Sequence, residues 1–395
     1  MRYNHSFSSA DILLPKCDFE NWAVIACDQY TSEPEYWEEV TAAAGDKPSA
    51  LNIVLPEVYL SVDNSERIEK INKNMQAYLD SNVFCEYPDS LIYVERIQSD
   101  GKCRQGIVGK IDLESYDYHA GTNAEIRATE QTVLSRIPPR VEIRKNAPLE
   151  LPHVMLLFDD AKNTVFSYLD SNKSDFEKVY DFTLMCNAGS IKGYLLNALA
   201  KDFVLSQFDS LKQQNDGFLF CVGDGNHSLA TAKECYNLNK TSASRYALTE
   251  VVNIHDTALE FEPIYRVVFG VNPQSLLDEF VKVLGEGTQK FICVYGNTVK
   301  EIGVNPTAKL AVGTLQAFLD EYVKNHPEAE IDYIHGEDSL KKLASRPNAI
   351  GFIFDGMQKS ELFEAVNADG SLPRKTFSMG HADDKRFYIE ARKIK

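Results

Sequence analysis

Near its middle the chain reads Phe218-Leu219-Phe220-Cys221-Val222-Gly223-Asp224-Gly225-Asn226-His227-Ser228, an apolar run that breaks at two glycines. The apolar run predicts a buried strand, and residues 229–236 predict a helix that follows at once. The first N–H groups of a helix lack intrahelical acceptors, and the helix dipole places about +0.5 charge there. The stretch therefore predicts a strand, a turn and a helix that form an anion-binding corner.

The turn in this stretch carries more chemistry than an ordinary turn needs. Gly223 and Gly225, on both sides of Asp224, let the backbone adopt positive φ and let a ligand approach it closely. Around them stand an acid, an amide and an imidazole, on Asp224, Asn226 and His227. A second interpretation stays open, because Asp-Gly and Gly-Asn pairs form ordinary turns and Asn226 would serve as a helix cap.

Composition limits the class of protein. A chain of 395 residues exceeds the roughly 250–300 residues of a single core, so we expect two domains or one elaborated domain. The net charge of −17 argues against duplex nucleic acid as a partner. Eight scattered cysteines indicate reduced thiols, and no apolar run is long enough for a bilayer, so we expect a soluble cytoplasmic protein without a membrane partner. The histidines form no HxH or HxxxH pattern, and neither a tight zinc site nor a haem site is expected.

The rest of the chain alternates short strands with amphipathic helices. Before the corner we expect strands at 23–26, 91–94, 105–111, 154–158 and 165–168, the last two paired, and a helix through Leu196, Leu199 and Phe203. After it we expect helices at 275–283 and 315–323 and strands at 291–295 and 310–312. A break at 270–273 indicates a domain boundary, with a core at 1–270 and a C-terminal α/β extension at 271–395.

Five blocks in fixed order resemble the domain-of-unknown-function family 1015. They are residues 23–30, residues 106–116, Thr129-Glu130-Gln131-Thr132 (similar to a His-Glu-x-Thr box), residues 224–228 (similar to Asp-Gly-His-His-Arg) and Pro373-Arg374-Lys375-Thr376-Phe377 (similar to a Pro-x-Lys-Ser-Thr box). Through this family the chain resembles the ParB/sulfiredoxin-like nucleotide-binding fold, which includes free-serine kinases. The resemblance implies an α/β protein with a mixed sheet.

The resemblance also implies a function and a set of site residues. It points to a kinase that uses ATP or ADP with Mg²⁺ to phosphorylate a small hydroxylated metabolite such as free serine. Phosphoryl transfer needs acids for metal and base, and N–H donors and cations for the phosphates. The expected catalytic residues are Asp224, Glu130 and His227, with Asp224 also the metal ligand; the expected nucleotide-binding residues are Gly223, Gly225, Asn226, Ser228, Arg266, Thr132, Arg140, Arg144 and Lys375.

Several positions depart from the family pattern. Asn226 stands where relatives carry histidine, and Ser228 stands where they carry an arginine that helps to hold phosphate. Sulfiredoxin-like chemistry needs a cysteine at the place of Asn226, and an amide cannot replace a thiolate nucleophile. Two other functions therefore stay open beside the kinase: a nucleotide-binding regulatory module without turnover, and a degenerate relative that binds no nucleotide.

Overall fold

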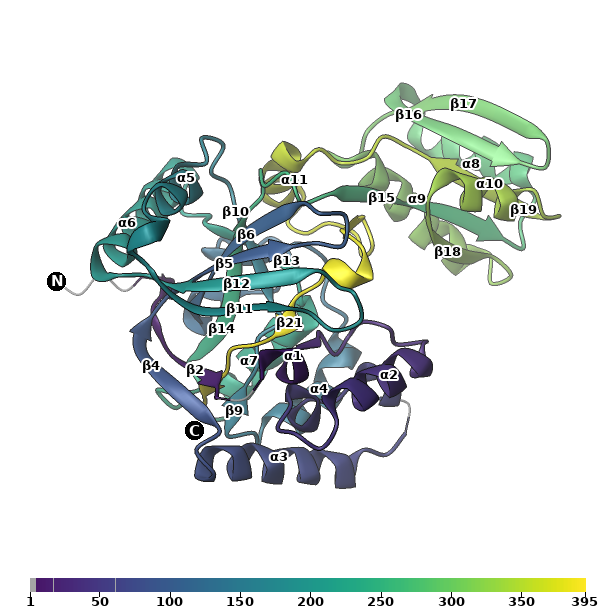
Figure 1. Cartoon of the computed structure of the whole chain (residues 1–395). Coiled ribbons are helices and arrows are strands. Elements are labelled where there is room, and N and C mark those ends of the chain that lie inside the picture. The colour runs from purple at the N-terminus through teal and green to yellow at the C-terminus, as the bar shows by residue number, and fades with distance from the viewer. Residues whose placement is uncertain (1–4, 17, 61) are drawn as a thin grey trace. The chain divides into compact units, whose positions relative to one another are not determined.

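The structure is a computed structural model that describes residues 5–16, 18–60 and 62–395 (Figure 1). The chain divides into two units: unit 1 holds Met1–Ala128, Thr132–Leu259 and His381–Lys395, and unit 2 holds Thr129–Gln131 and Glu260–Gly380. The predicted boundary near residue 270 lies ten residues beyond this division, just after a strand of unit 2. The last 15 residues, which the prediction gave to the extension, belong to unit 1 because they pair with its strands.

Unit 1 is built on a ten-stranded mixed sheet. Its strands run in the order β11 (Glu177–Thr183), β12 (Ser190–Leu195), β5 (Ile92–Ile97), β6 (Cys103–Asp112), β14 (Tyr246–Asn253), β10 (Met155–Phe158), β13 (Phe220–Asp224), β8 (Ile126–Ala128) and β7 (Tyr116–Asp117), with β1 (Phe7–Ser8) beside β6. β13 pairs antiparallel with β10 and parallel with β8. The predicted class, an α/β protein with a mixed sheet, is confirmed.

Successive side chains of a strand point to opposite faces of a sheet. Apolar side chains of this sheet point to both faces, and helices cover each face. On β5, Tyr93 belongs to one core cluster while Ile92 and Val94 belong to the other. The first cluster packs under α4 (Ile137–Arg144), α5 (Thr164–Ser171), α6 (Ala198–Gln214) and α7 (Asn226–Leu238). The second packs under α1 (Phe19–Trp22), α2 (Pro34–Ala44) and α3 (Ser65–Asp80).

Three small sheets and several 3₁₀ turns complete unit 1. The small sheets pair β2 (Ala10–Pro15) with β4 (Phe84–Ser90), β3 (Val24–Ile25) with β21 (Phe387–Tyr388), and β9 (Leu149–Glu150) with β22 (Arg392–Lys393). The 3₁₀ turns are η1 (Ala50–Ile53), η2 (Glu57–Tyr59), η3 (Leu113–Ser115), η4 (Leu134–Arg136), η5 (Lys173–Asp175) and η7 (Ala382–Asp384).

Unit 2 has its own sheet and core. Its strands run in the order β17 (Thr298–Val304), β16 (Glu286–Tyr295), β19 (Ala349–Ile353), β15 (Phe261–Phe269) and β18 (Glu330–His335), and β20 (Phe377–Met379) pairs with β15. The helices are α8 (Pro273–Leu284), α9 (Ala311–Asn325), α10 (Glu337–Ala344) and α11 (Leu362–Asp369), with the turn η6 (Lys359–Glu361). Phe280 of α8 packs on Phe291 of β16 and Phe318 of α9, with ring centroids 5.4 and 4.7 Å away.

Two predicted strands are wrong. Residues 165–168 lie in α5, where the Asp160 carboxylate accepts the Val165 N–H at 2.9 Å and the buried residues follow helical spacing. Residues 310–312 open α9 and share its buried face. The other predicted elements form, except that Leu196 lies before α6 and not in it, and α9 ends at Asn325 as expected from the Asn-His-Pro sequence. Among the helices that the structure describes, none is long and apolar enough to cross a membrane.

Candidate functional site

The predicted corner forms where β13 runs into α7. β13 ends at Asp224, Gly225 adopts a left-handed conformation with φ of 82°, and α7 begins at Asn226. The N-cap residue is Gly225, which has no side chain to cap the helix, and the first N–H groups of a helix lack intrahelical acceptors. The Asp224 carboxylate accepts the Gly225 N–H at 3.0 Å, which orients it beside the helix start.

The two glycines of the corner act differently from each other. Gly225 has the predicted positive φ, and a Cβ there would lie 3.0–3.3 Å from Val154 and His153. Gly223 does not use this freedom, because its φ is not positive. Its missing side chain leaves room for Leu157, whose Cγ would lie 2.9 Å from an added Cβ.

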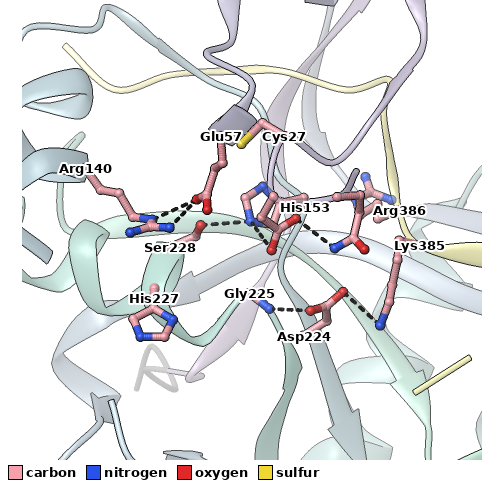
Figure 2. Close-up of polar contacts among 12 residues, drawn as sticks. Cys27, Glu57, Arg140, His153, Asp224, Gly225, His227, Ser228, Lys385 and Arg386 are labelled. Carbon is pink, nitrogen blue, oxygen red and sulfur yellow. Dashed lines mark hydrogen bonds and ion pairs between the residues drawn. The ribbon is translucent and has the colours of Figure 1, made fainter. Parts of the chain in front are cut away.

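Strand pairing brings His153 to the corner. β10 runs antiparallel to β13 with Met155 opposite Asp224, so the residues just before β10 lie next to the start of α7. His153 is 6% exposed, and its Nε2 lies 2.8 Å from Ser228 Oγ (Figure 2). Its Nδ1 lies 2.6 Å from the Tyr388 hydroxyl. The sequence prediction included Ser228 but not His153.

His153 is a buried cation. Burial by itself lowers the pKa of an imidazole, but the negative charge of Asp28, together with Cys27 and Asp224, outweighs burial and raises the pKa of His153 to about 10. The imidazolium has two N–H donors, which serve Tyr388 and Ser228. The Asp28 carboxylate lies 4.0 Å from the His153 Nε2 atom.

The C-terminal segment adds a second cation. β21 pairs with β3 so that Phe387 lies opposite Ile25, and the Ala26 N–H donates to the Arg386 carbonyl at 2.9 Å. This pairing places residues 385–388 beside Cys27 and Asp28. Lys385 Nζ lies 3.6 Å from Asp224 Oδ2, as Figure 2 shows, and the Tyr388 hydroxyl accepts the Cys27 N–H at 3.1 Å.

A buried ion network holds this segment in place. The Arg386 guanidinium pairs with Glu250 and with Glu390, and its Nε–H donates to the Pro152 carbonyl at 2.9 Å. All three ionised side chains are at most 2% exposed. Because Arg386 binds the residue before His153 and follows Lys385, it fixes the spacing between the two cations.

His227 lies on the other side of the helix start from Ser228 (Figure 2). Burial and the positive charges of Arg140 and Arg136 lower the pKa of His227 to about 4, so the ring is neutral at pH 7. Its Nε2 accepts the Val133 N–H at 3.3 Å, one residue after the predicted Thr132. A ring with this pKa is not poised to shuttle protons near neutral pH, and its remaining N–H can donate to an anion.

Two of the three arginines predicted as phosphate ligands, Arg140 and Arg144, already pair with acids. Arg140 Nε donates to Glu57 Oε1 at 2.9 Å, and Arg144 pairs with Glu150, which also binds Arg392. Each pair is mostly buried, with side chains at most 20% exposed. The charges of Arg140 and Glu57 cancel, whereas Arg144 and Arg392 share the single carboxylate of Glu150 and keep a net positive charge.

Three predicted residues belong to unit 2. Arg266 is fully buried, and its guanidinium donates to Gln316 Oε1 at 2.7 Å and to three backbone carbonyls, including that of Lys375. Glu130 forms an isolated parallel β-bridge with Leu372 through its backbone. Burial lowers the pKa of Arg266, and the negative charge of Glu130 partly offsets this effect. The contacts that Arg266 makes stabilise unit 2 itself.

The arrangement in unit 1 can bind an anion next to two acids. The helix N-terminus, His153 and Lys385 supply positive charge and donors, while Asp28 and Asp224 supply carboxylates. Among the described residues no cluster of three His, Cys, Asp or Glu side chains could hold a metal by itself. The sequence prediction missed four members: Asp28, His153, Lys385 and Tyr388. The one local signal for them was the polar pair Cys27-Asp28 directly after an apolar run.

Comparison with known families identifies the chain. Residues 10–393 match the family described as "Protein of unknown function (DUF1015)", so the chain belongs to this family, and the predicted resemblance to it is confirmed. The ParB/sulfiredoxin-like label stays a prediction. No curated protein matches the chain significantly.

Solved structures with a similar course of the chain include a free serine kinase variant in complex with ADP, with 11% identity, a TM-score of 0.42 and coverage of 72% of this chain and 91% of that one. A conserved hypothetical protein from Pyrococcus furiosus has 13% identity and a TM-score of 0.38, with 72% and 94% covered. SbnI from Staphylococcus aureus has 10% identity and a TM-score of 0.38, with 69% and 82% covered.

Proposed function

We propose that this member of the DUF1015 family binds the phosphates of ATP or ADP at the start of α7 and transfers a phosphoryl group to the hydroxyl of a small metabolite. The observation that carries the proposal is the meeting of two kinds of charge at one corner of unit 1. Donors and cations for phosphate stand beside two carboxylates, and phosphoryl transfer needs both.

The phosphate contacts are assigned from the donors that remain available. The start of α7 offers N–H groups that have no acceptor within the helix, and Gly225 at the N-cap lets an anion approach them closely. Ser228 Oγ accepts the Nε2–H of the imidazolium His153, which leaves its own O–H free to donate to a phosphate oxygen. Lys385 acts as a point charge at the same place.

The two carboxylates take different roles. Asp224 is tied to Gly225 and Lys385 at the helix start, so it belongs on the phosphate side. Asp28 accepts a hydrogen bond from Gln29 at 3.0 Å and is 25% exposed, which makes it the acid that an incoming hydroxyl can reach. We assign Asp28 as the base that accepts the hydroxyl proton.

The donor set fits Mg²⁺ of the kind that accompanies nucleotides. Mg²⁺ usually takes one or two carboxylates and completes its shell with water and phosphate oxygens, so it does not need a cluster of three protein ligands. Asp224, on the phosphate side, would hold it. When bound, the ion neutralises charge on the phosphates.

The first test is nucleotide binding by the full chain. ATP or ADP with Mg²⁺ at about 100 times Kd stabilises a protein by about 2.7 kcal/mol, which is expected to raise Tm by about 5 °C or more. If neither nucleotide changes Tm, the proposal is refuted and the degenerate relative is favoured. If a nucleotide binds but a panel of amino acids, sugars and alcohols gives no phosphorylated product, the regulatory module is favoured.

The second test separates the two acids. Asp28→Asn is expected to lower kcat at least about 100-fold while the nucleotide still raises Tm, because a general base contributes about 10²–10⁴. Asp224→Asn is expected to abolish transfer and weaken nucleotide binding. The matched control is Asp159→Asn: Asp159 pairs with His255 at 2.6 Å just after β10, at the end of that strand opposite His153. An Asp28 variant with full activity, or an equal loss in the Asp159 variant, contradicts the assignment.

A further inference from the structure

A cavity of about 150 Å³ shares a wall with the corner site in unit 1. The shared wall consists of Ser228 at the corner and of three residues that lie beside it, His153, Cys27 and Tyr388. The opposite walls come from η1, η2, α3 and α4. A molecule held at the corner can therefore extend into this space.

Most of the lining is hydrocarbon. The 3₁₀ turns and the segment between and after them contribute Ile53, Leu55 and Leu60, α3 contributes Met75, and α4 contributes Ile143. An apolar lining leaves a buried polar group of a ligand without hydrogen bonds, which costs free energy. The lining therefore favours an apolar group over a polar one.

The charged side chains of the wall are paired with one another. Glu57 binds Arg140, and Glu150 binds Arg144. His153, the remaining cation of the wall, donates its two N–H groups to Tyr388 and Ser228. The charged side chains that could bind a charged group of a ligand already bind one another or neighbouring hydroxyls. The wall therefore fits an uncharged group.

The volume sets the size of this group. A protein cavity of about 150 Å³ lined by apolar side chains binds benzene. The space beside the corner therefore holds a ring of six carbons or a branched aliphatic group of the same size.

We propose that the cavity receives an uncharged hydrocarbon substituent of the phosphate acceptor, so that the substrate is an alcohol carrying a group of about six carbons. This inference rests on the proposed function, because it places the acceptor hydroxyl at Asp28. It sets the acceptor apart from free serine, whose ammonium and carboxylate would meet the apolar wall.

The probes are benzene, 2-phenylethanol, ethylene glycol and serine, each added to the full chain. Benzene and 2-phenylethanol are expected to raise Tm. In a transfer assay with ATP and Mg²⁺, 2-phenylethanol is expected to give a kcat/KM at least ten times that of ethylene glycol or serine. A nucleotide-induced rise in Tm, measured in the same samples, reports the proposed function separately.

A variant that fills the cavity tests the location. Ala232 lines the cavity from α7 and is 3% exposed, so Ala232→Leu is expected to abolish the benzene-induced rise in Tm and keep the nucleotide-induced one. Ala42→Leu, at an exposed position of α2, is the matched control and is expected to keep both. If Ala232→Leu does not fold, Ala147→Val on another wall replaces it with the same expectation.

Each outcome decides the inference. Benzene that leaves the Tm of the natural chain unchanged, or that still binds in both cavity variants, overturns it. Benzene binding together with transfer to serine or ethylene glycol alone overturns the acceptor class and leaves the proposed function intact. Benzene binding without any nucleotide-induced shift or product overturns the proposed function, and with it the role of the cavity in holding an acceptor.

Discussion

The substitution Gly225→Ala tests the corner most directly. Gly225 has φ of 82°, and a Cβ there would lie 3.0 Å from Val154 Cγ2 and 3.3 Å from His153 Cδ2. Gly101, in the turn between β5 and β6, has φ of 84°, and no described atom lies within 4 Å of its ideal Cβ. Gly225 and Gly101 thus share a backbone conformation and differ in the atoms that surround them.

The expected magnitudes follow from this difference. An alanine in the left-handed region costs about 1–2 kcal/mol, so Gly101→Ala is expected to lower the free energy of unfolding by that amount. Crowding a packed position costs a further 1–3 kcal/mol or so. Gly225→Ala is therefore expected to cost about 2–5 kcal/mol, at least about 1 kcal/mol more than Gly101→Ala.

Urea unfolding followed by tryptophan fluorescence measures these costs in the right part of the chain. The chain has two tryptophans, Trp22 and Trp37, and both are buried in unit 1 together with the two glycines. The crowding also displaces the start of α7, so Gly225→Ala alone is expected to weaken the nucleotide-induced rise in Tm. Equal destabilisation by the two substitutions, or nucleotide binding unchanged by Gly225→Ala, would refute the reasoning.

Two further predictions concern the buried charges beside the corner. The pKa of His153 is raised in the folded state, so the stability it contributes is complete below about pH 6.5 and is lost as pH rises through about 10. Urea titrations are expected to show a fall of up to about 1.4 kcal/mol per pH unit across this window, and His153→Gln is expected to flatten it; an unchanged slope would show that His153 is not charged. Arg386→Met removes the guanidinium between Glu250 and Glu390 and is expected to cost about 3–5 kcal/mol, because the buried Glu390 loses its cation and the buried Glu250 keeps only Arg104, at 3.6 Å. The double variant that adds Glu390→Gln is expected to recover part of this loss, and a larger loss in it would contradict the pairing.

The corner itself could be predicted from the sequence because its information is local. An apolar run, two glycines and a helical pattern stand within 20 residues, and the structure forms the strand, turn and helix in that order. The same locality explains the two wrong strands. Residues 165–168 are apolar enough for a strand, but Asp160 supplies a helix-starting acceptor five residues upstream of Val165. A side-chain contact of this kind is not visible in hydrophobic periodicity.

The partners of the corner could not be predicted because they arrive through strand pairing over long distances. His153 reaches Ser228 only because β10 runs antiparallel to β13, and the sequence of two short buried strands does not state their direction or register. Lys385 reaches Asp224 because β21 pairs with β3, more than 350 residues away along the chain. The ion pairs of two predicted site residues could not be foreseen for a related reason. Arg140 and Arg144 have the right side chain for phosphate, but the fold supplies each with a buried acid.

These long-range contacts bear on the arginine of the family pattern that this chain lacks at position 228. Ser228 stands where the resemblance implies a phosphate-binding arginine, and its loss alone would leave the corner with only the partial charge of the helix. In the structure the imidazolium of His153 lies 2.8 Å from Ser228 Oγ, and Lys385 lies 3.6 Å from Asp224. Both cations are held by the C-terminal segment through Tyr388 and Arg386. An arginine at position 228 would place its charge against the imidazolium. This arrangement of charges therefore accommodates a serine at position 228. The absence of the arginine's charge does not by itself argue that the site is degenerate.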